Sequence, residues 1–205
     1  MAKLYYRYGA MNSGKSTALM QVAFNYEERG MRVFILKPSL DTKGGECLLS
    51  RLGVSRPVDK AVTPDMDVFE LVKQEAARGD KPLACVLTDE SQFFTPQQAE
   101  QLFMVTVKLN IPVIAYGLRT DFSMQGFPGS TRLLELAHAI EEMKTICTCG
   151  RKATCNGRKV NGEFVFEGDQ VAIDQENNVE YQSLCAQCYF AEREKFYQRH
   201  PKVRV

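Results

Sequence analysis

The chain has 205 residues, 44% of them apolar, which is enough for one substantial hydrophobic core and at most one small additional lobe. Its 26 basic and 25 acidic residues sum to a formal charge of +1, so no strong global field attracts it to nucleic acid or anionic lipid. No apolar stretch approaches the roughly 18 residues that span a bilayer, and the first residues lack the apolar run of a secretory signal. We therefore expect a cytoplasmic protein with a small-molecule substrate and neither a membrane nor a nucleic-acid partner.

Strands alternate with helices along the first part of the chain. The aromatic-rich run over residues 4–8 predicts a buried strand, and apolar residues at helical spacing predict a helix from about Lys15 to a cap at Gly30. Further elements are expected as strands over 32–36, 83–87 and 111–116 and as a helix over 97–108. This alternation indicates an α/β fold, a mainly parallel sheet with helices on both faces.

Two later regions differ in composition from these elements. Residues 38–64 are rich in glycine, serine, aspartate and basic residues and show no clear period, so we expect an irregular loop near the active face. After residue 143 cysteines and glycines become frequent, which is typical of a small β-rich lobe, and the tail over 186–197 can form a helix. We place the domain boundary between a core over residues 1–142 and a lobe over residues 143–205.

The string GAMNSGKST matches the phosphate-binding pattern G-x-x-x-x-G-K-[ST] and lies between a predicted strand and a predicted helix. Glycines let the backbone wrap a phosphate, N–H groups at the helix N-terminus point at it, and Lys15 adds a positive charge. Ser16 is expected to bind magnesium. A chance match arises in on the order of one such chain per hundred, and the strand–helix context lowers that figure. The residues expected to bind ATP here are Gly9, Ala10, Met11, Asn12, Ser13, Gly14, Lys15, Ser16 and Thr17.

Two adjacent carboxylates, Asp89 and Glu90, follow the apolar run over residues 83–87. A phosphoryl-transfer enzyme with such a phosphate-binding loop also needs an acidic residue at the end of a neighbouring strand to hold the metal ion. Since successive residues at a strand end point to different sides, we assign Asp89 to magnesium and Glu90 to general-base catalysis on the acceptor hydroxyl. The alternative is a pair of solvated charges that close a strand.

Four of the seven cysteines occur in two close pairs, Cys147 with Cys149 and Cys185 with Cys188. Four thiolates suit a tetrahedral zinc ion, and a closed set of four sulfur ligands indicates a structural site. Such a site would stabilise a lobe too small to build a sufficient core of its own. The C-x-C spacing of the first pair is tighter than usual, so a redox motif or four unrelated buried thiols are the alternatives.

The chain also carries DESQFF at residues 89–94 and YGLRTDF at residues 116–122. Together with the N-terminal phosphate-binding loop and the late cysteine pairs, these strings resemble the cellular-type (type II) thymidine kinase family over nearly the whole chain. The resemblance implies a RecA-like P-loop core and transfer of the γ-phosphoryl group of ATP to the 5′-hydroxyl of thymidine or deoxyuridine. It further implies a homotetramer that thymidine triphosphate inhibits.

The resemblance also assigns individual residues, and its roles for Asp89 and Glu90 agree with those argued from their chemistry. It implies that a lasso-like loop from the zinc-binding lobe covers the base. Asp174 and Gln175 stand where the family has a glycine pair in that loop, and Lys43 stands where it has an arginine. The implied nucleoside contacts are Met11, Phe93, Leu118, Phe122, Val171, Ala172, Ile173 and Tyr181. The further implied contacts on the ATP side are Asp41, Lys43, Gln92 and Arg158.

A different class of protein, a P-loop ATPase whose zinc ribbon binds nucleic acid, would share the loop and the cysteines. It would require a basic stripe with exposed aromatic residues, whereas the basic residues of the tail are interleaved with glutamates. A nucleotide-binding regulator without turnover would have no need of Glu90 beside the metal-binding carboxylate. The kinase is therefore the interpretation that the sequence favours.

Overall fold

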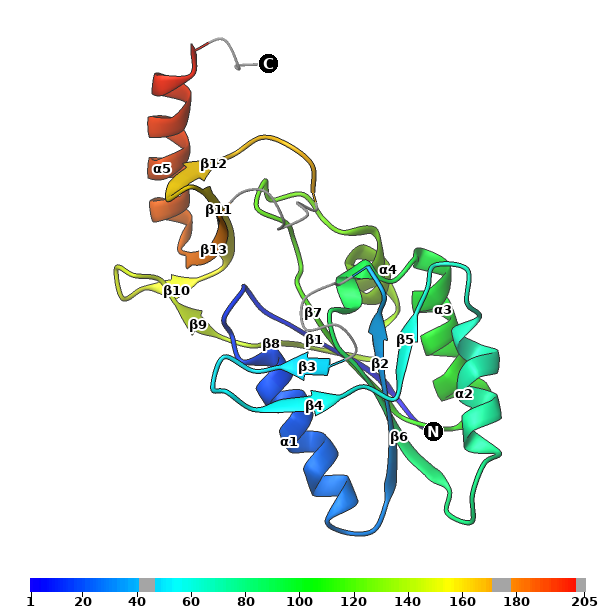
Figure 1. The fold of residues 1–205 in the computed structure, drawn as a ribbon. Coiled ribbons are helices and arrows are strands. Elements are labelled where there is room, and N and C mark those ends of the chain that lie inside the picture. Colours follow the sequence, from blue (N-terminus) through cyan, green and yellow to red (C-terminus); the bar gives the residue numbers. More distant parts are fainter. Residues whose placement is uncertain (41–46, 171–177, 202–205) are drawn as a thin grey trace. The chain divides into compact units, whose positions relative to one another are not determined.

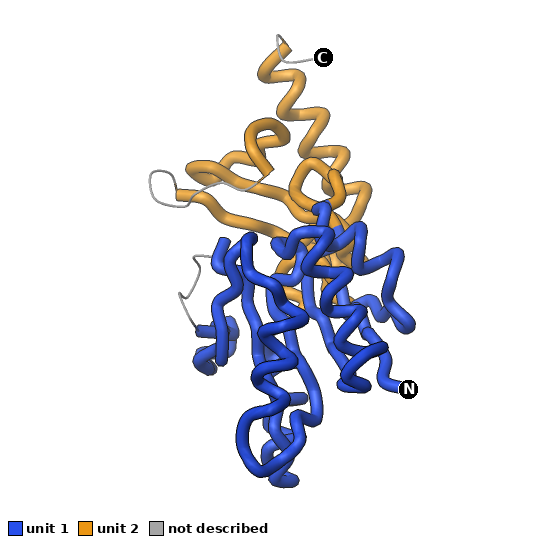
Figure 2. Tube along the Cα trace, turned by 90° about the vertical axis from the view of Figure 1, so that its right-hand side faces the viewer, with its two compact units in different colours: residues 1–8, 14–119, 127–143 blue, residues 9–13, 120–126, 144–205 orange. Residues whose placement is uncertain are grey.

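The computed structural model describes residues 1–40, 47–170 and 178–201, and its backbone divides into two compact units (Figure 2). Unit 1 comprises Met1–Tyr8, Gly14–Arg119 and Phe127–Met143. Unit 2 comprises Gly9–Ser13, Thr120–Gly126 and Lys144–Val205. Two short segments of the first 142 residues thus group with the C-terminal lobe. The domain boundary after residue 142 stays a prediction.

Unit 1 is built on a six-stranded sheet in which every pair of neighbouring strands is parallel (Figure 1). In spatial order the strands are β5 (Lys60–Val62), β2 (Arg32–Pro38), β6 (Leu83–Thr88), β7 (Val113–Gly117), β1 (Leu4–Tyr8) and β8 (Ala139–Glu142). Parallel pairing brings the carboxyl ends of β1, β6 and β7 to one edge of the sheet, where ligands of such folds bind.

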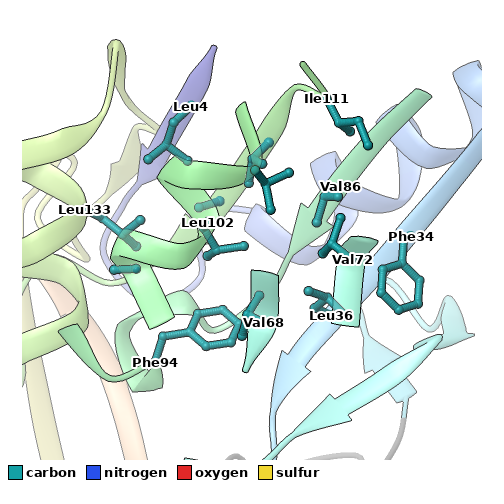
Figure 3. Close-up of a cluster of buried hydrophobic side chains, with 14 of the residues drawn as sticks. Leu4, Phe34, Leu36, Val68, Val72, Val86, Phe94, Leu102, Ile111 and Leu133 are labelled. Atoms are coloured by element: carbon teal, nitrogen blue, oxygen red, sulfur yellow. The ribbon is translucent and has the colours of Figure 1, made fainter. Parts of the chain in front are cut away.

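Helices cover both faces of this sheet, as predicted. On one face α1 (Lys15–Glu27) buries Leu19 and Ala23 against strand residues such as Ile114. The opposite face is covered by α2 (Val68–Ala76), α3 (Pro96–Met104) and α4 (Pro128–Leu136) (Figure 1). Figure 3 shows the larger cluster, in which side chains such as Val86 pack among residues of these helices. None of the helices over the described residues is both long and apolar enough to cross a lipid bilayer.

Local chemistry explains where the helices of unit 1 begin. The side chain of Asp67 accepts a hydrogen bond from the Glu70 N–H at 2.9 Å and caps α2. Thr95 and Gln98 form a reciprocal capping box at the start of α3, which also has Pro96 in its first turn. After α3 the chain continues as a π-helical turn, Val105–Leu109.

The predicted strands and the helix after residue 97 are found, with shifts of a few residues at their ends. The prediction of an irregular loop over residues 38–64 was wrong for its described part. That part carries the antiparallel pair β3 (Cys47–Leu49) and β4 (Ser55–Pro57) and the edge strand β5. Strands of three residues are too short to show the alternation of buried and exposed side chains by which a strand is predicted. Of these described strands, β3 contributes Leu48 to the hydrophobic cluster that also contains residues of α1.

Unit 2 is the expected β-rich lobe. Strand β11 (Cys155–Val160) lies between the antiparallel strands β12 (Glu163–Val165) and β13 (Val179–Leu184), beside a two-stranded ribbon, β9 (Thr145–Ile146) with β10 (Lys152–Ala153). Helix α5 (Ala186–Arg199) closes the core, in which the Phe166 ring contacts Tyr189 and Phe196 edge to face at 5.2 and 5.8 Å. At Gly157 a Cβ atom would lie 2.7 Å from the Phe164 ring, so β11 needs a glycine to pack there.

One close approach in unit 1 gives a stability test. A Cβ atom at Gly129 in α4 would overlap the carbonyl oxygen of Phe94 and come within 2.9 Å of that of Gln92. We expect Gly129→Ala to lower the free energy of unfolding by roughly 1–3 kcal/mol because the backbone contact must open. Glu135→Ala, an exposed change in the same helix, should stay within about 0.5 kcal/mol. Equal denaturant midpoints for the two variants would contradict this account of the packing.

Candidate active site and metal centre

The loop between β1 and α1 has the backbone that phosphate binding requires. Asn12 and Gly14 adopt left-handed conformations, with φ of 65° and 77°. The first turn of α1, which the structure describes in full, contains no side-chain cap and no acidic residue. Its N–H groups and the positive end of the helix dipole are therefore suited to an anion.

Lys15 and Ser16 begin α1 beside the end of β6. Lys15 is buried, and burial lowers the pKa of its ammonium group against the opposing charges of Glu90 and Asp89. The hydroxyl of Ser16 donates to Asp89 Oδ2 at 2.8 Å. The next hydroxyl, that of Thr17, instead shares a 2.6 Å hydrogen bond with Ser50. The structure thus brings the predicted lysine, serine and two carboxylates together.

Asp89 is the most deeply buried acidic group of this cluster, with 3% of its surface exposed. Burial and then the charge of Glu90 raise its pKa to about 7, while the Ser16 hydroxyl and Lys15 act in the opposite direction. Its second oxygen, Oδ1, is buried without a hydrogen-bond partner among the described residues. A buried carboxylate with an unsatisfied oxygen beside a serine hydroxyl fits magnesium, which prefers oxygen ligands.

Glu90 follows directly and leaves the strand in the left-handed region, at φ 46° and ψ 39°. This conformation is strained for a residue with a side chain and is common at functional sites. Its carboxylate Oε2 accepts a hydrogen bond from Gln92 Nε2 at 2.5 Å. Glu90 and Asp89 are thus held by different partners, as the assignment of two separate roles requires.

Unit 2 contains two residues that contact Met11 of the phosphate-binding loop and that the sequence did not indicate. The side chain of Asn156 accepts from the Met11 N–H at 2.8 Å and donates to the Thr120 carbonyl at 2.9 Å. The hydroxyl of Ser183 donates to the Met11 carbonyl. Asn156 and Ser183 face each other in register on β11 and β13. No local pattern in either strand singles out these two residues, and only the strand register pairs them.

Arg158 lies two residues further along β11 and on the same face. Its guanidinium stacks 3.6 Å above the centre of the Phe122 ring and donates to the carbonyls of Asp169, at 2.8 Å, and Glu167, at 2.7 Å. Tyr181 is its cross-strand neighbour. The predicted nucleoside contacts Phe122 and Tyr181 therefore gather around this arginine, whereas a phosphate contact of Arg158 stays a prediction.

The other predicted binding residues fall into two groups. Phe93 and Leu118 belong to unit 1, where the Phe93 ring meets Phe127 edge to face at 5.6 Å. The remaining predicted residues, Asp41, Lys43, Val171, Ala172 and Ile173, lie outside the described residues.

The four paired cysteines converge in unit 2. Cys147 and Cys149 lie in the turn between β9 and β10, while Cys185 and Cys188 lie at the start of α5. All four sulfur atoms lie within 4.8 Å of one another, and those of Cys149 and Cys185 are 3.6 Å apart. Zn–S bonds of about 2.3 Å in a tetrahedron place the sulfurs about 3.8 Å apart. The cluster therefore has the donors and the spacing of a zinc site.

The protonation of these thiols supports the same reading. Burial opposes ionisation of Cys147, but backbone N–H donors at Cys149 and Cys185 lower its pKa to about 6. The Cys188 thiol donates hydrogen bonds to the other three sulfurs, that of Cys149 first, and these bonds raise its pKa to about 12. Four crowded thiols cannot all ionise on their own, and a divalent cation removes that restriction. All seven cysteines of the chain are free of disulfides.

Comparison with known proteins gives a consistent result. The family model described as "Thymidine kinase" matches residues 2–189. A thymidine kinase of Ruegeria pomeroyi is 46% identical over 187 residues, covering 90% of this chain and 92% of the relative. The thymidine kinase of Enterobacteria phage T4 is 44% identical, covering 90% and 94%. That of Chromobacterium violaceum is 46% identical, covering 92% and 98%.

The cysteine cluster leads to a test by metal analysis. We expect elemental mass spectrometry of the purified protein to find about one zinc ion per chain. Cys149→Ser should lose most of that zinc and lower the melting temperature, because a bound zinc ion would link the β9–β10 turn to the start of α5. Cys85→Ser, a change in the core of unit 1, should keep the zinc. Full zinc occupancy in Cys149→Ser would rule out a four-cysteine site.

Proposed function

Because this chain belongs to the thymidine kinase family and is a thymidine kinase, we propose that it transfers the γ-phosphoryl group of ATP to the 5′-hydroxyl of thymidine or deoxyuridine, with Glu90 as the general base. The observation that carries this proposal is the cluster of Lys15, Ser16, Asp89 and Glu90 in unit 1. A cation, a metal-binding carboxylate and a separate second carboxylate are the groups that this reaction requires.

The phosphates of ATP are proposed to bind the loop over residues 9–17. Its left-handed residues and the uncapped start of α1 present N–H groups to an anion. Lys15 is suited to the negative charge that spreads over the transferred group, because a buried ammonium acts in surroundings with little competing water. Binding of a phosphate would also offset the cost of keeping this side chain charged.

Ser16 and Asp89 are the residues that would hold magnesium, since they offer a hydroxyl and a buried carboxylate with an unsatisfied oxygen. When bound, the ion neutralises part of the phosphate charge and helps to orient the phosphates. In its absence burial favours a proton on Asp89. The hydrogen bond between Ser16 and Asp89 keeps the two oxygens together and so prepares both for one cation.

Glu90 is proposed to take the proton of the 5′-hydroxyl while that oxygen bonds to the γ-phosphorus. The bond from this phosphorus to the oxygen that bridges it to the β-phosphate breaks, and ADP leaves. A carboxylate held apart from the metal-binding Asp89 can accept this proton without losing a ligand to the cation. The separate hydrogen-bond partners of the two carboxylates, Gln92 and Ser16, support this division.

The nucleoside base is proposed to contact the side chains that the family resemblance implies, which among the described residues are Met11, Phe93, Leu118, Phe122 and Tyr181. Aromatic and aliphatic walls suit a flat pyrimidine with a methyl group. The stacking of Arg158 on Phe122 supports a role for this arginine on the nucleoside side. The proposed contacts of residues 171–173 with the base rest on the family resemblance.

A homotetramer in the cytoplasm, inhibited by thymidine triphosphate, completes the proposal and rests on the same resemblance. Light scattering on the purified protein measures the mass directly. A monomer at the concentration of the activity assay would contradict the tetramer without bearing on the phosphoryl transfer.

The proposed reaction is tested by following ADP release from ATP and magnesium with thymidine, deoxyuridine, deoxycytidine or single-stranded DNA as the added compound. We expect release with thymidine or deoxyuridine, accompanied by the nucleoside 5′-monophosphate in equal amount. Release that depends on DNA alone would refute the proposed acceptor.

The role of Glu90 gives a second test. We expect Glu90→Gln to lower turnover by roughly 100-fold or more, because an amide cannot accept the proton, while ATP affinity measured by calorimetry stays the same. Glu100→Gln makes the same chemical change at an exposed position on α3 and should leave turnover unchanged. Wild-type turnover in Glu90→Gln would remove this residue as the base.

A further inference from the structure

We propose that Gln92 is a positioning residue that fixes the carboxylate of Glu90 by linking it to the backbone after β7. This inference rests on the proposed role of Glu90 as general base. It differs from the contact with ATP that the family resemblance implies for Gln92.

The side-chain amide of Gln92 is engaged at both ends. Its Oε1 accepts a hydrogen bond from the Leu118 N–H at 3.0 Å, and its Nε2 donates to Glu90 Oε2 at 2.5 Å. The orientation of the amide follows from chemistry, because a peptide N–H can only donate and therefore requires the amide oxygen. The NH₂ group must then face Glu90. Gln92 thus links the segment after β6 to the segment after β7, and the two bonded residues, Gln92 and Leu118, are 26 positions apart in the sequence.

The surroundings leave the Gln92 side chain little freedom. It is 2% exposed and belongs to the short helical turn η1 (Ser91–Phe93). A Cβ atom at Gly117 would lie 3.0 Å from Gln92 Oε1 and 3.1 Å from its backbone nitrogen, so the chain approaches this amide as closely as a glycine permits. On the other side of the turn, Thr88 and Ser91 share a buried hydroxyl hydrogen bond of 2.6 Å. The amide is therefore a rigid support for the carboxylate it contacts.

Glu90 has particular need of such a support. It is half-buried in a left-handed conformation, and an unheld glutamate side chain samples several rotamers. A base must lie within hydrogen-bond reach of the proton it takes, and small displacements cost rate. Since the hydrogen bond from Gln92 engages Oε2, the carboxylate can be held through one oxygen and accept the proton through the other.

Two substitutions separate this role from an ATP contact. Gln92→Met removes both hydrogen bonds at similar volume, and we expect kcat to fall roughly 10- to 100-fold while the KM values for ATP and thymidine change less than about twofold. Gln92→Glu keeps the shape and the acceptor for Leu118 but replaces the donor that faces Glu90. Its kcat relative to wild type should rise as the pH is lowered, because a protonated carboxyl at position 92 can donate again. A raised KM for ATP with unchanged kcat would instead identify Gln92 as an ATP contact.

A double-mutant cycle with Glu90→Gln distinguishes the two proposals. If Gln92 acts through Glu90, adding Gln92→Met to Glu90→Gln should change kcat by less than about twofold. Independent effects that multiply in the double variant would overturn the positioning role even if Glu90→Gln alone abolishes turnover. Full turnover in Glu90→Gln would refute the base itself. Melting curves of each variant report folding, and Gln92→Glu supplies a test of the same shape if Gln92→Met unfolds.

Discussion

The parallel register of β1, β6 and β7 is the constraint on which the site in unit 1 depends. Pairing of β6 with β7 sets Thr88 beside Ala115, and pairing of β7 with β1 sets Ala115 beside Tyr6. All three strands therefore end at one edge of the sheet, and the residues that follow them lie at that edge. The start of α1, the two carboxylates and the backbone at Gly117 meet because the sheet brings their strands to a common end.

Both units hold acidic groups in surroundings that disfavour their full ionisation. In unit 1 a carboxylate with 3% exposure is held against a serine hydroxyl with one oxygen unsatisfied. In unit 2 four thiols lie within 4.8 Å of one another. Full ionisation of the carboxylates or of the thiols is unfavourable without a metal ion, because desolvation and mutual repulsion favour protonation, and in unit 1 Lys15 only partly opposes this. The first cluster has oxygen donors and suits a hard, exchangeable cation, whereas the second has sulfur donors and suits a permanent one.

Features that depend on sequence alone were predictable, and features that depend on register were not. The phosphate-binding loop, the carboxylate pair and each cysteine pair can be recognised within a few consecutive residues, so their spacing identified side chains that the structure brings together. Asn156 and Ser183 become a pair only when β11 and β13 are aligned, and no local pattern sets that alignment. The engagement of Gln92 likewise requires Leu118, which follows a different strand. Short strands such as β3 were not predicted for another reason, since three residues are too few to show a periodic pattern.

Strand β11 has two faces with different tasks. Cys155 and Gly157 belong to the aromatic core beside the thiol cluster, while Asn156 and Arg158 hold Met11, Thr120 and Phe122. The lobe therefore includes two loops that the gene encodes far upstream of it. A chimaera that receives residues 144–205 alone would place Arg158 against the recipient's own residue at position 122, whereas Asn156 bonds to backbone groups that any residue other than proline supplies. An exchange that keeps this stacked pair therefore transfers residues 120–126 together with the lobe.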